Sequence, residues 1–283
     1  MKILVTGYNG QLGFDIGRQA ETYDVEIIGI DINDLDITKE QEVYNFIAEH
    51  KPDAIIHCAA YTAVDKAEDD QEQCWTVNVE GTRHLAQAAR NVNAKFMYIS
   101  TDYVFDGEGT DEFIEADKPE PVGYYGLTKY EGEKVIQSIF DEYFIVRISW
   151  VFGINGNNFV KTMLKLAESR DVLNVVADQI GSPTYTFDLA RLLLDMIQTN
   201  QFGIYHATNE GFISWQEFAQ EIFKLTGKNV TVNGITTDEY PTRAVRPKNS
   251  RMLKQKLVEA GFAPLPNWKD ALQRYLKELT NEG

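Results

Sequence analysis

The sequence of 283 residues contains only two cysteines, Cys58 and Cys74, and only four histidines. Two cysteines cannot form the disulfide framework of a small secreted protein, and these two lack the spacing of metal ligands. The histidines form no ligand pattern either. They are His50, His57, His84 and His206. We therefore expect packing roles for the cysteines and structural roles for the histidines, and we predict no metal site.

Positive charge and long apolar runs are also scarce. The sequence has 27 Lys and Arg against 43 Asp and Glu, which gives a net charge of −16. Such a protein is not expected to bind nucleic acid or an anionic membrane through a broad basic face. No apolar run approaches the roughly twenty residues that a membrane-spanning helix needs, and the start of the chain lacks the pattern of a signal peptide. These absences predict a cytoplasmic globular protein without nucleic-acid or membrane partners.

One short segment near the C-terminus is locally basic. Arg243, Arg246, Lys248 and Arg251 lie within nine residues. An anionic ligand of an acidic protein must meet a local cationic site, so this segment is the candidate for binding one. A solvated loop is the alternative interpretation.

The first residues of the chain carry the strongest motif. An apolar run at 3–5 is followed by Gly7, Gly10 and Gly13, and a helix-forming stretch begins at once. Glycines allow a tight turn and the close approach of a pyrophosphate, while the first helical turn offers free N–H groups. The spacing differs from the Gly-x-Gly-x-x-Gly fingerprint, and an ordinary strand-to-helix turn is the alternative. The motif predicts a dinucleotide site.

An acidic residue follows at the distance that a dinucleotide site requires. Asp31 ends the second apolar run, roughly twenty residues beyond the glycines, where a carboxylate can bind the ribose hydroxyls. A carboxylate also repels a 2′-phosphate, so we expect tolerance of NADH. The candidate cofactor contacts in this part of the chain are Gly7, Asn9, Gly10, Gln11, Leu12, Gly13, Asp31, Asp36 and Ile37.

Strand and helix patterns alternate along the first half of the chain. Further strands are expected at 54–60, 95–100 and 143–149, with helices at about 38–51, where Thr38 would be the N-cap, and 71–91. This alternation predicts right-handed crossovers and a parallel sheet. We predict an α/β fold with a doubly wound, Rossmann-like parallel sheet and a smaller C-terminal α/β lobe. The dinucleotide-binding domain is expected at 1–150, with some later segments at about 151–205 returning to it, and the substrate-binding lobe at 206–283.

Three residues downstream suggest carbonyl reduction. Thr101 ends the fourth strand, and Tyr125 and Lys129 lie one turn apart on one helix face. A carbonyl that receives a hydride must also receive a proton, and a nearby ammonium lowers the pKa of a phenol that supplies it. A second pair with the same spacing, Tyr130 and Lys134, lies about 140° round the helix from the first. We predict that Thr101, Tyr125 and Lys129 are catalytic.

Several longer segments carry a family resemblance. They lie at 59–68, 100–107, 149–151, 157–159, 178–183 and 246–251. With the glycine motif and the Tyr125/Lys129 pair, they resemble the extended short-chain dehydrogenase/reductase superfamily and, within it, the dTDP-4-dehydrorhamnose reductase family. The resemblance implies that NADPH or NADH reduces the C4 ketone of dTDP-4-dehydro-L-rhamnose. The product would be dTDP-L-rhamnose, a precursor of bacterial surface polysaccharide.

The resemblance also implies residue roles. Thr101 would orient the keto oxygen, Tyr125 would protonate it, and Lys129 would bind the nicotinamide ribose. Ala59, Ala60 and Tyr61 would border the cofactor. The candidate substrate contacts are Thr62, Val64, Tyr103, Trp150, Asn158 and, for the pyrophosphate, Arg246. For Trp150, plain core packing is the alternative.

Some features leave alternatives open. His57 stands where the family often has asparagine. Some members bind magnesium at a dimer interface through carboxylates, for which Asp15, Glu278 and Glu282 are candidates here, but the pattern is too loose to predict a metal. The sequence leaves both a monomer and a homodimer open. Two rival functions are a nucleotide-sugar epimerase or dehydratase with retained NAD, and a non-catalytic dinucleotide-binding subunit such as the regulatory subunit of methionine adenosyltransferase.

Overall fold

A six-stranded parallel sheet forms the centre of the protein. The structure is a computed structural model, and it describes residues 1–281. The sheet order is β10-β5-β4-β3-β1-β2. Its strands are β1 (Lys2–Thr6), β2 (Glu26–Ile30), β3 (Ala54–His57), β4 (Lys95–Thr101), β5 (Phe144–Ile148) and β10 (Gly203–His206). All five neighbouring pairs are parallel, which confirms the predicted fold class.

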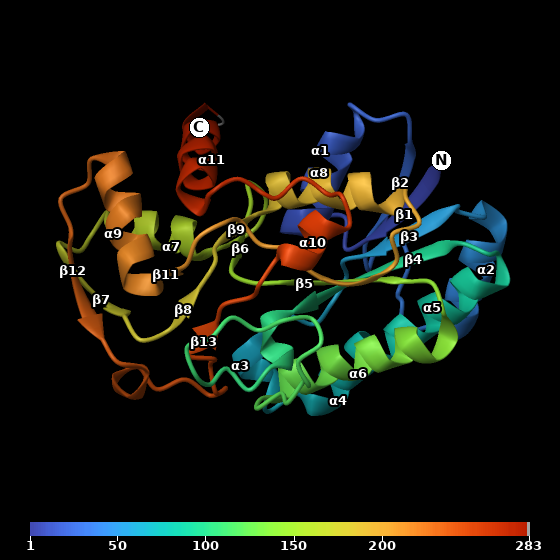
Figure 1. Ribbon diagram of the computed structural model, residues 1–283, viewed down its shortest axis with the longest axis horizontal. Coiled ribbons are helices and arrows are strands. Elements are labelled where there is room, and N and C mark those ends of the chain that lie inside the picture. Colours follow the sequence, from blue (N-terminus) through green and yellow to red (C-terminus); the bar gives the residue numbers. More distant parts are fainter. Residues whose placement is uncertain (282–283) are drawn as a thin grey trace.

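Helices cover both faces of this sheet (Figure 1). One face carries α1 (Gln11–Ala20) and α8 (Thr186–Ile197), which pack against each other. The other carries α2 (Glu40–His50), α5 (Thr82–Asn91) and α6 (Tyr124–Ile139). Ile3 and Val5 of β1 point into the first layer, and Leu4 points into the second. This is why β1 is apolar throughout and does not alternate with polar residues.

The order in which strands are added reverses in the middle of the sheet. From β1 the chain moves outward to β2, and it then returns to β3 on the other side of β1. In open α/β sheets, ligands bind beyond the carboxyl ends of the strands at such a switch point. Gly7 follows β1 there with a φ of +65°, and a Cβ on it would lie 2.8 Å from the backbone nitrogen of Ala59. The two strand ends therefore approach too closely for any residue but glycine.

Two helical details differ from the sequence prediction. The predicted N-cap of α2 at Thr38 is wrong, since the helix begins at Glu40 after Lys39. The Thr38 hydroxyl and N–H both donate to the Asp36 carboxylate, so Thr38 closes a local turn instead. The predicted helix at 71–91 is continuous, but Thr76–Gly81 within it forms a π-helix between α4 (Gln71–Trp75) and α5.

A second hydrophobic core forms a lobe beside the sheet. Its elements are β6 (Val151–Phe152), α7 (Phe159–Leu166), β7 (Val172–Val176), α9 (Trp215–Thr226), β12 (Thr231–Ile235) and α11 (Trp268–Asn281). Figure 1 shows α7, α9, β7 and β12 grouped at the end of the molecule away from β2. Within 151–205, α7 and β7 pack in this lobe, whereas α8 and β10 pack with the sheet. The predicted boundaries at 150 and 206 stay a prediction.

Further short elements complete the described fold. They are α3 (Val64–Ala67), β8 (Ile180–Gly181), β9 (Thr184–Tyr185), β11 (Ile213–Ser214), β13 (Asn249–Ser250) and α10 (Gln255–Glu259), with 3-10 turns at Asp102–Val104 and Thr237–Glu239. Among the described residues 1–281, every helix is too short or too polar to cross a lipid bilayer.

Candidate active site

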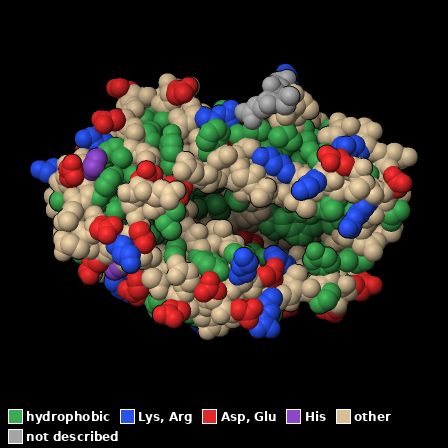
Figure 2. Space-filling model, turned by 180° about the vertical axis from the view of Figure 1, so that it is seen from behind, with side chains coloured by type: hydrophobic (Ala, Val, Ile, Leu, Met, Phe, Trp, Pro, Cys, Tyr) green, Lys and Arg blue, Asp and Glu red, His purple; other side chains and the backbone are tan. Residues whose placement is uncertain are grey.

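A cavity of about 740 Å³ lies at the switch point of the sheet. Figure 2 shows one face of the molecule hollowed near its centre, with hydrophobic side chains in the hollow. The predicted site residues that line the cavity are Gly7, Gly10, Gln11, Leu12, Gly13, Asp31, Asp36, Ile37, Ala59, Ala60, Tyr61, Thr62, Val64, Thr101, Tyr103, Tyr125, Lys129 and Trp150. Segments from the whole N-terminal half thus meet in one space.

The glycine turn has the geometry of a phosphate cradle. The Gly10 N–H donates to the Gly7 carbonyl oxygen over 3.0 Å, which closes the turn before α1. A Cβ on Gly13 would lie 2.6 Å from the Cα of Tyr8, so the helix can start this close to the strand only without a side chain. Backbone N–H groups at the start of α1 remain available for an anion. These residues fit the pyrophosphate of a dinucleotide.

Asp31 lies where an adenosine ribose would be recognised. It follows β2 and lines the cavity. Its carboxylate accepts hydrogen bonds from the backbone N–H groups of Asn9, at 3.1 Å, and Ile32, at 2.8 Å. These two bonds fix the carboxylate beside the glycine turn. Asn9 therefore acts on the site through its backbone N–H, which holds Asp31, although Asn9 itself is absent from the residues that line the cavity.

Tyr125 and Lys129 both face the cavity from the first turns of α6. Thr101 reaches the same space from the carboxyl end of β4. The alternative pair lies elsewhere, because Tyr130 packs in a separate cluster with Val104, Phe105 and Met252. The helical spacing thus separates the two Tyr-x-x-x-Lys matches as predicted.

The acidity of Tyr125 differs from the sequence expectation. Desolvation of the phenol and the negative charge of Asp102 raise its pKa above the usual value of 10, and a hydrogen bond with Thr101 lowers it. Tyr125 is therefore held in its protonated form, as a proton donor must be before it reacts.

Lys129 is an almost fully buried lysine, with 3% of its surface exposed. Burial lowers its pKa to about 7, and the charge of Glu133 opposes this shift. Its ammonium nitrogen lies 4.1 Å from the centroid of the Tyr98 ring. A buried lysine with a perturbed pKa beside a tyrosine is typical of a catalytic site.

The sequence analysis missed Asp102, which lines the cavity beside Thr101. The Thr101 hydroxyl donates to one carboxylate oxygen over 3.0 Å, and the Ser250 hydroxyl of β13 donates to the other over 2.6 Å. Burial raises the pKa of Asp102 to about 6. Its place inside the segment 100–107 was a usable signal, because an acid at a strand's carboxyl end faces the ligand crevice.

A buried ion pair beneath the cavity was also missed. Arg147 of β5 donates two hydrogen bonds to Glu133, at 2.9 and 2.7 Å. Glu133 also accepts the Ser100 hydroxyl over 2.5 Å, so it fixes the strand end that carries Thr101. Glu133 continues the four-residue spacing of Tyr125 and Lys129 along α6, and this periodicity could have revealed it.

Two predicted substrate residues lie outside the cavity lining. Asn158 is the N-cap of α7, and its amide donates to Gln11, the Gly153 carbonyl and Tyr275. Arg246 donates to the Tyr103 hydroxyl over 3.2 Å and to Asp65 over 2.6 Å. Asn158 thus links the lobe to the glycine turn, whereas Arg246 contacts Tyr103, a residue of the cavity wall.

Trp150 forms part of the cavity wall under backbone strain. Its φ is +49°, which is unusual for a bulky residue. The indole stacks on Trp215 of α9, with ring centroids 3.6 Å apart. Gly181 leaves room for the ring, since a Cβ there would lie 2.8 Å from it. Strained residues of this kind concentrate at ligand sites.

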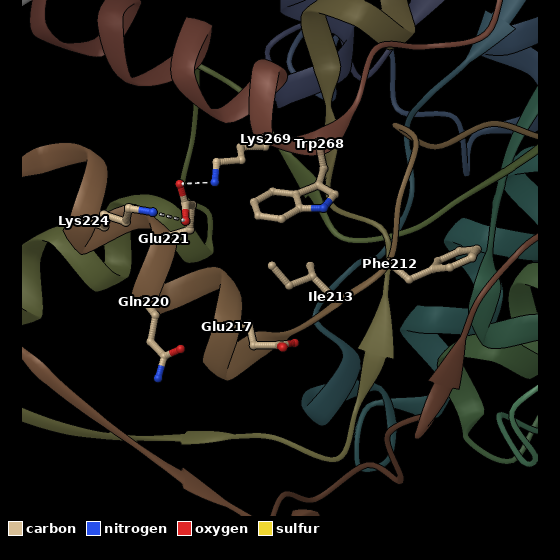
Figure 3. Close-up of a pocket in the computed structure, with 8 residues that line it drawn as sticks. All are labelled: Phe212, Ile213, Glu217, Gln220, Glu221, Lys224, Trp268 and Lys269. Atoms are coloured by element: carbon tan, nitrogen blue, oxygen red, sulfur yellow. Dashed lines mark ion pairs between the residues drawn. The ribbon is translucent and has the colours of Figure 1, made fainter.

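A second pocket, of about 410 Å³, lies on the lobe between α9 and α11 (Figure 3). Its charged groups already have partners: Glu221 pairs with Lys269 at 2.9 Å and with Lys224 at 3.7 Å. Glu217 closes the capping box of α9 with Ser214. This pocket shares no residue with the larger cavity, and we assign no ligand to it.

The carboxylates of Asp15 and Glu278, which were considered as magnesium ligands, form ion pairs and hydrogen bonds with other side chains. Arg18 bridges Asp15 and Glu278, and Thr186 and Tyr185 donate to the same two carboxylates. Glu282 lies outside the described residues. Within 1–281, the His, Cys, Asp and Glu side chains form no group of three that could hold a metal ion.

The fold and the site together define a class. A doubly wound sheet with a glycine turn at its switch point, and a tyrosine and lysine one helical turn apart in the same cavity, is the arrangement of a short-chain dehydrogenase/reductase.

Comparison with known proteins identifies the group within this class. The sequence model of the RmlD substrate binding domain matches residues 1–281. A dTDP-4-dehydrorhamnose reductase from Aggregatibacter actinomycetemcomitans is 41% identical over 285 residues, covering 96% of this chain and 97% of the relative. The chain therefore belongs to the RmlD substrate binding domain family, and the predicted resemblance is confirmed.

Two crystal structures of dTDP-4-dehydrorhamnose reductases are similar to this one. That from Clostridium acetobutylicum has a TM-score of 0.97 at 45% identity, covering 99% of this chain and 100% of its own. That from Bacillus anthracis, in complex with NADP, has a TM-score of 0.95 at 42% identity, covering 98% and 99%. This similarity and the glycine turn agree on a nicotinamide dinucleotide as the cofactor.

Proposed function

We propose that this protein reduces the C4 ketone of dTDP-4-dehydro-L-rhamnose to a hydroxyl, with NADPH or NADH, and so produces dTDP-L-rhamnose. One observation carries the proposal. In a chain of this family, Thr101, Tyr125 and Lys129 line the same cavity as the glycine turn. The product would serve as a precursor of surface polysaccharide, and the enzyme would act in the cytoplasm, where reduced nicotinamide cofactors are kept.

Tyr125 is the proton donor in this proposal. When bound, the reduced nicotinamide supplies the hydride that adds to C4. The C4 oxygen then takes the phenolic proton of Tyr125, which balances the addition. Thr101 hydrogen-bonds the same oxygen once its hydroxyl turns away from Asp102, to which it donates in the structure. Fixed donors aimed at an oxygen where charge develops lower the barrier of such a step.

Lys129 has two roles in the proposal. Its ammonium binds the ribose hydroxyls next to the nicotinamide, and its positive charge favours the phenoxide that Tyr125 becomes. Because burial lowers its pKa to about 7, Lys129 is partly charged at neutral pH before ligands bind.

The remaining cavity residues and the lobe would bind the nucleotide sugar. Tyr103, Trp150, Thr62 and Val64 line the cavity, where they would contact the sugar. Arg246, which donates a hydrogen bond to Tyr103, would grip the pyrophosphate through its planar guanidinium. Ala59, Ala60 and Tyr61 would border the nicotinamide, and Asn158 would contact the nucleotide. In this scheme 1–150 binds the dinucleotide and 206–283 covers the substrate.

A spectrophotometric assay tests the proposal directly. Purified protein is mixed with dTDP-4-dehydro-L-rhamnose and NADPH or NADH, and the near-ultraviolet absorbance of the reduced nicotinamide is followed. We expect its loss to match the dTDP-L-rhamnose formed. An epimerase or dehydratase would instead hold tight NAD after purification and turn over without added reductant.

The variant Tyr125→Phe separates the reductase from a non-catalytic subunit. We expect kcat to fall about 10²- to 10⁴-fold, as for loss of a general acid, with little change in cofactor affinity. Tyr130→Phe is the matched control on the same helix and should keep full activity. Unchanged turnover in Tyr125→Phe would end the proposed mechanism.

A further inference from the structure

We propose that Tyr98 is a positioning residue for Lys129, and that the face of its aromatic ring seats the lysine ammonium. The proposal rests on the function proposed above, because it concerns the same site. Tyr98 lies in the middle of β4 and is fully buried on the face of the sheet that α6 covers.

Tyr98 contacts Lys129 at both ends of the lysine. The ammonium nitrogen lies 4.1 Å from the centroid of the Tyr98 ring. The Tyr98 hydroxyl donates a hydrogen bond of 3.3 Å to the backbone carbonyl oxygen of Lys129. One residue of the sheet thus holds both the helix backbone and the charged end of the side chain.

The helix is shaped to admit the Tyr98 side chain. Gly132 lies three residues beyond Lys129, and a Cβ on it would clash with the hydroxyl group of Tyr98. The same Cβ would lie 3.0 Å from the carbonyl oxygen of Asn78 in the π-helix. Because glycine removes this obstacle, α6 can approach the ring closely enough for the two contacts with Lys129.

Several titratable groups lie near the Lys129 ammonium, and none of them replaces the role proposed for the Tyr98 ring. Burial lowers the pKa of Lys129 to about 7, and the charge of Glu133 acts in the opposite direction. The titratable groups that interact with Lys129 are Glu133 from α6, His57 and Cys58 from the end of β3, Cys74 from α4, and Tyr98 from β4. Tyr125 lines the same cavity as Lys129. Burial also lowers the pKa of His57 to about 3, so His57 adds no positive charge.

An aromatic face attracts an ammonium most strongly where water is excluded. The Tyr98 ring therefore stabilises the charged form of Lys129 and restricts where its nitrogen can lie. Glu133 supplies charge but is held by Arg147 and Ser100, so it cannot also follow the ammonium. The ring is the contact that sets the direction of the lysine toward the cavity.

Two substitutions of Tyr98 separate the ring from the hydroxyl. Tyr98→Phe keeps the ring and loses the hydrogen bond to Lys129, whereas Tyr98→Leu loses both. The pKa of Lys129 is measured in the cofactor-free protein by NMR of ¹³C-labelled lysine, with the signal assigned by Lys129→Met. We expect Tyr98→Leu to lower this pKa by about one unit, a tenfold loss of proton affinity, and Tyr98→Phe to change it by less than about a third of that.

A kinetic measurement gives a second readout. The pH profile of kcat/KM for the cofactor reports the groups of the free enzyme. Since the lysine must be charged, its alkaline limb should move to lower pH in Tyr98→Leu and stay in place in Tyr98→Phe.

Phe96→Leu is the matched control, because Phe96 is fully buried two residues earlier on the same face of β4 and packs on Phe140. It should lower the melting temperature as Tyr98→Leu does, without moving the Lys129 titration. If Tyr98→Leu does not fold, Tyr98→Met fills the volume without a ring and takes its place.

The proposal fails if the ring-free variant leaves the Lys129 pKa unchanged, or if Tyr98→Phe or Phe96→Leu shifts it equally. The NMR titration needs neither substrate nor turnover. If the Lys129 pKa shifts as expected but the protein does not reduce the dTDP sugar, the proposed function is refuted. The proposed role of the Tyr98 ring in positioning Lys129 would still stand.

Discussion

The Thr101 hydroxyl donates a hydrogen bond of 3.0 Å to the Asp102 carboxylate, at the edge of the sheet that faces the cavity. A hydroxyl has one proton, so Thr101 cannot donate to a keto oxygen while this bond persists. The Thr101 hydroxyl must therefore turn away from Asp102 before it can donate to a substrate oxygen. A protonated Asp102 can donate to Thr101 and release the hydroxyl for the substrate.

Asp102 should also couple stability to pH. Burial raises its pKa from 3.8 to about 6, so the folded state holds this proton more tightly than the unfolded chain. Its contribution to stability is therefore present below about pH 4 and is lost as the pH rises through about 6. We expect wild type, relative to Asp102→Asn, to lose up to about 3 kcal/mol of unfolding free energy between pH 4 and 7. Urea unfolding of both proteins across this range measures the difference, and a constant difference would contradict the prediction.

Replacement of Arg246 should weaken the binding of the substrate and leave the binding of the cofactor unchanged. Its guanidinium donates to Tyr103 and Asp65 at the edge of the site. Lysine keeps the charge but lacks the planar fork that grips a pyrophosphate. We expect Arg246→Lys to raise KM for the dTDP sugar about 10- to 100-fold, the loss of one charged hydrogen bond, with KM for the cofactor unchanged.

Arg243→Lys is the matched control for this experiment. Arg243 lies three residues away and pairs with Asp69 at an exposed position. Its variant should keep both KM values. A rise in the cofactor KM for Arg246→Lys, or equal effects in the two variants, would remove Arg246 from the substrate site.

Gly13 should tolerate no side chain, because the backbone of Gly7 and Tyr8 lies against it. A Cβ on it would lie 2.6 Å from the Cα of Tyr8, and the backbone cannot yield without opening the turn. We expect Gly13→Ala to lower the unfolding free energy by about 1–3 kcal/mol, as overpacking does. It should also abolish the rise in melting temperature that NADPH gives the wild type.

Gly10→Ala provides the comparison for Gly13→Ala. A Cβ on Gly10 would lie 3.1 Å from the Gly7 carbonyl oxygen, a tight but adjustable distance. Thermal unfolding with and without NADPH should show a smaller loss of stability and of cofactor response for Gly10→Ala than for Gly13→Ala. Equal losses in both variants would show that the turn does not depend on the close approach at Gly13.

Local patterns were enough to predict the sheet and much of the cavity. The glycine turn, the apolar β1 and the four-residue step from Tyr125 to Lys129 are properties of neighbouring residues. Parallel strands bring their carboxyl ends to one edge, so Thr101 could be placed near Tyr125 without coordinates. The choice of Tyr125 over Tyr130 needed only the helical angle between them.

Contacts between distant segments could not be predicted in this way. Ser250 reaches Asp102 across 148 positions, and Arg246 reaches Asp65 across 181. No periodicity pairs such residues, because the path of the loop that carries Ser250 and Arg246 decides which of them meet. The raised pKa of Tyr125 was missed for the same reason, since it depends first on the burial of the phenol and then on the nearby charge of Asp102.

Asp31 should set the choice between NADH and NADPH. Its carboxylate lines the cavity and is fixed by the N–H groups of Asn9 and Ile32, so it cannot easily turn away from a 2′-phosphate. We expect the wild type to prefer NADPH over NADH by less than roughly a hundredfold in kcat/KM, and Asp31→Asn to raise that ratio about tenfold by removing the repulsion.

Asp34→Asn separates this specific effect from a general change in charge. Asp34 accepts the Asp31 N–H over 2.9 Å but is absent from the residues that line the cavity. Its variant changes the net charge by the same amount, yet it should leave the cofactor ratio unchanged because the remaining carboxylate of Asp31 still faces the ribose. A wild-type preference for NADPH above roughly a hundredfold, or equal shifts in the two variants, would show that another group selects the cofactor.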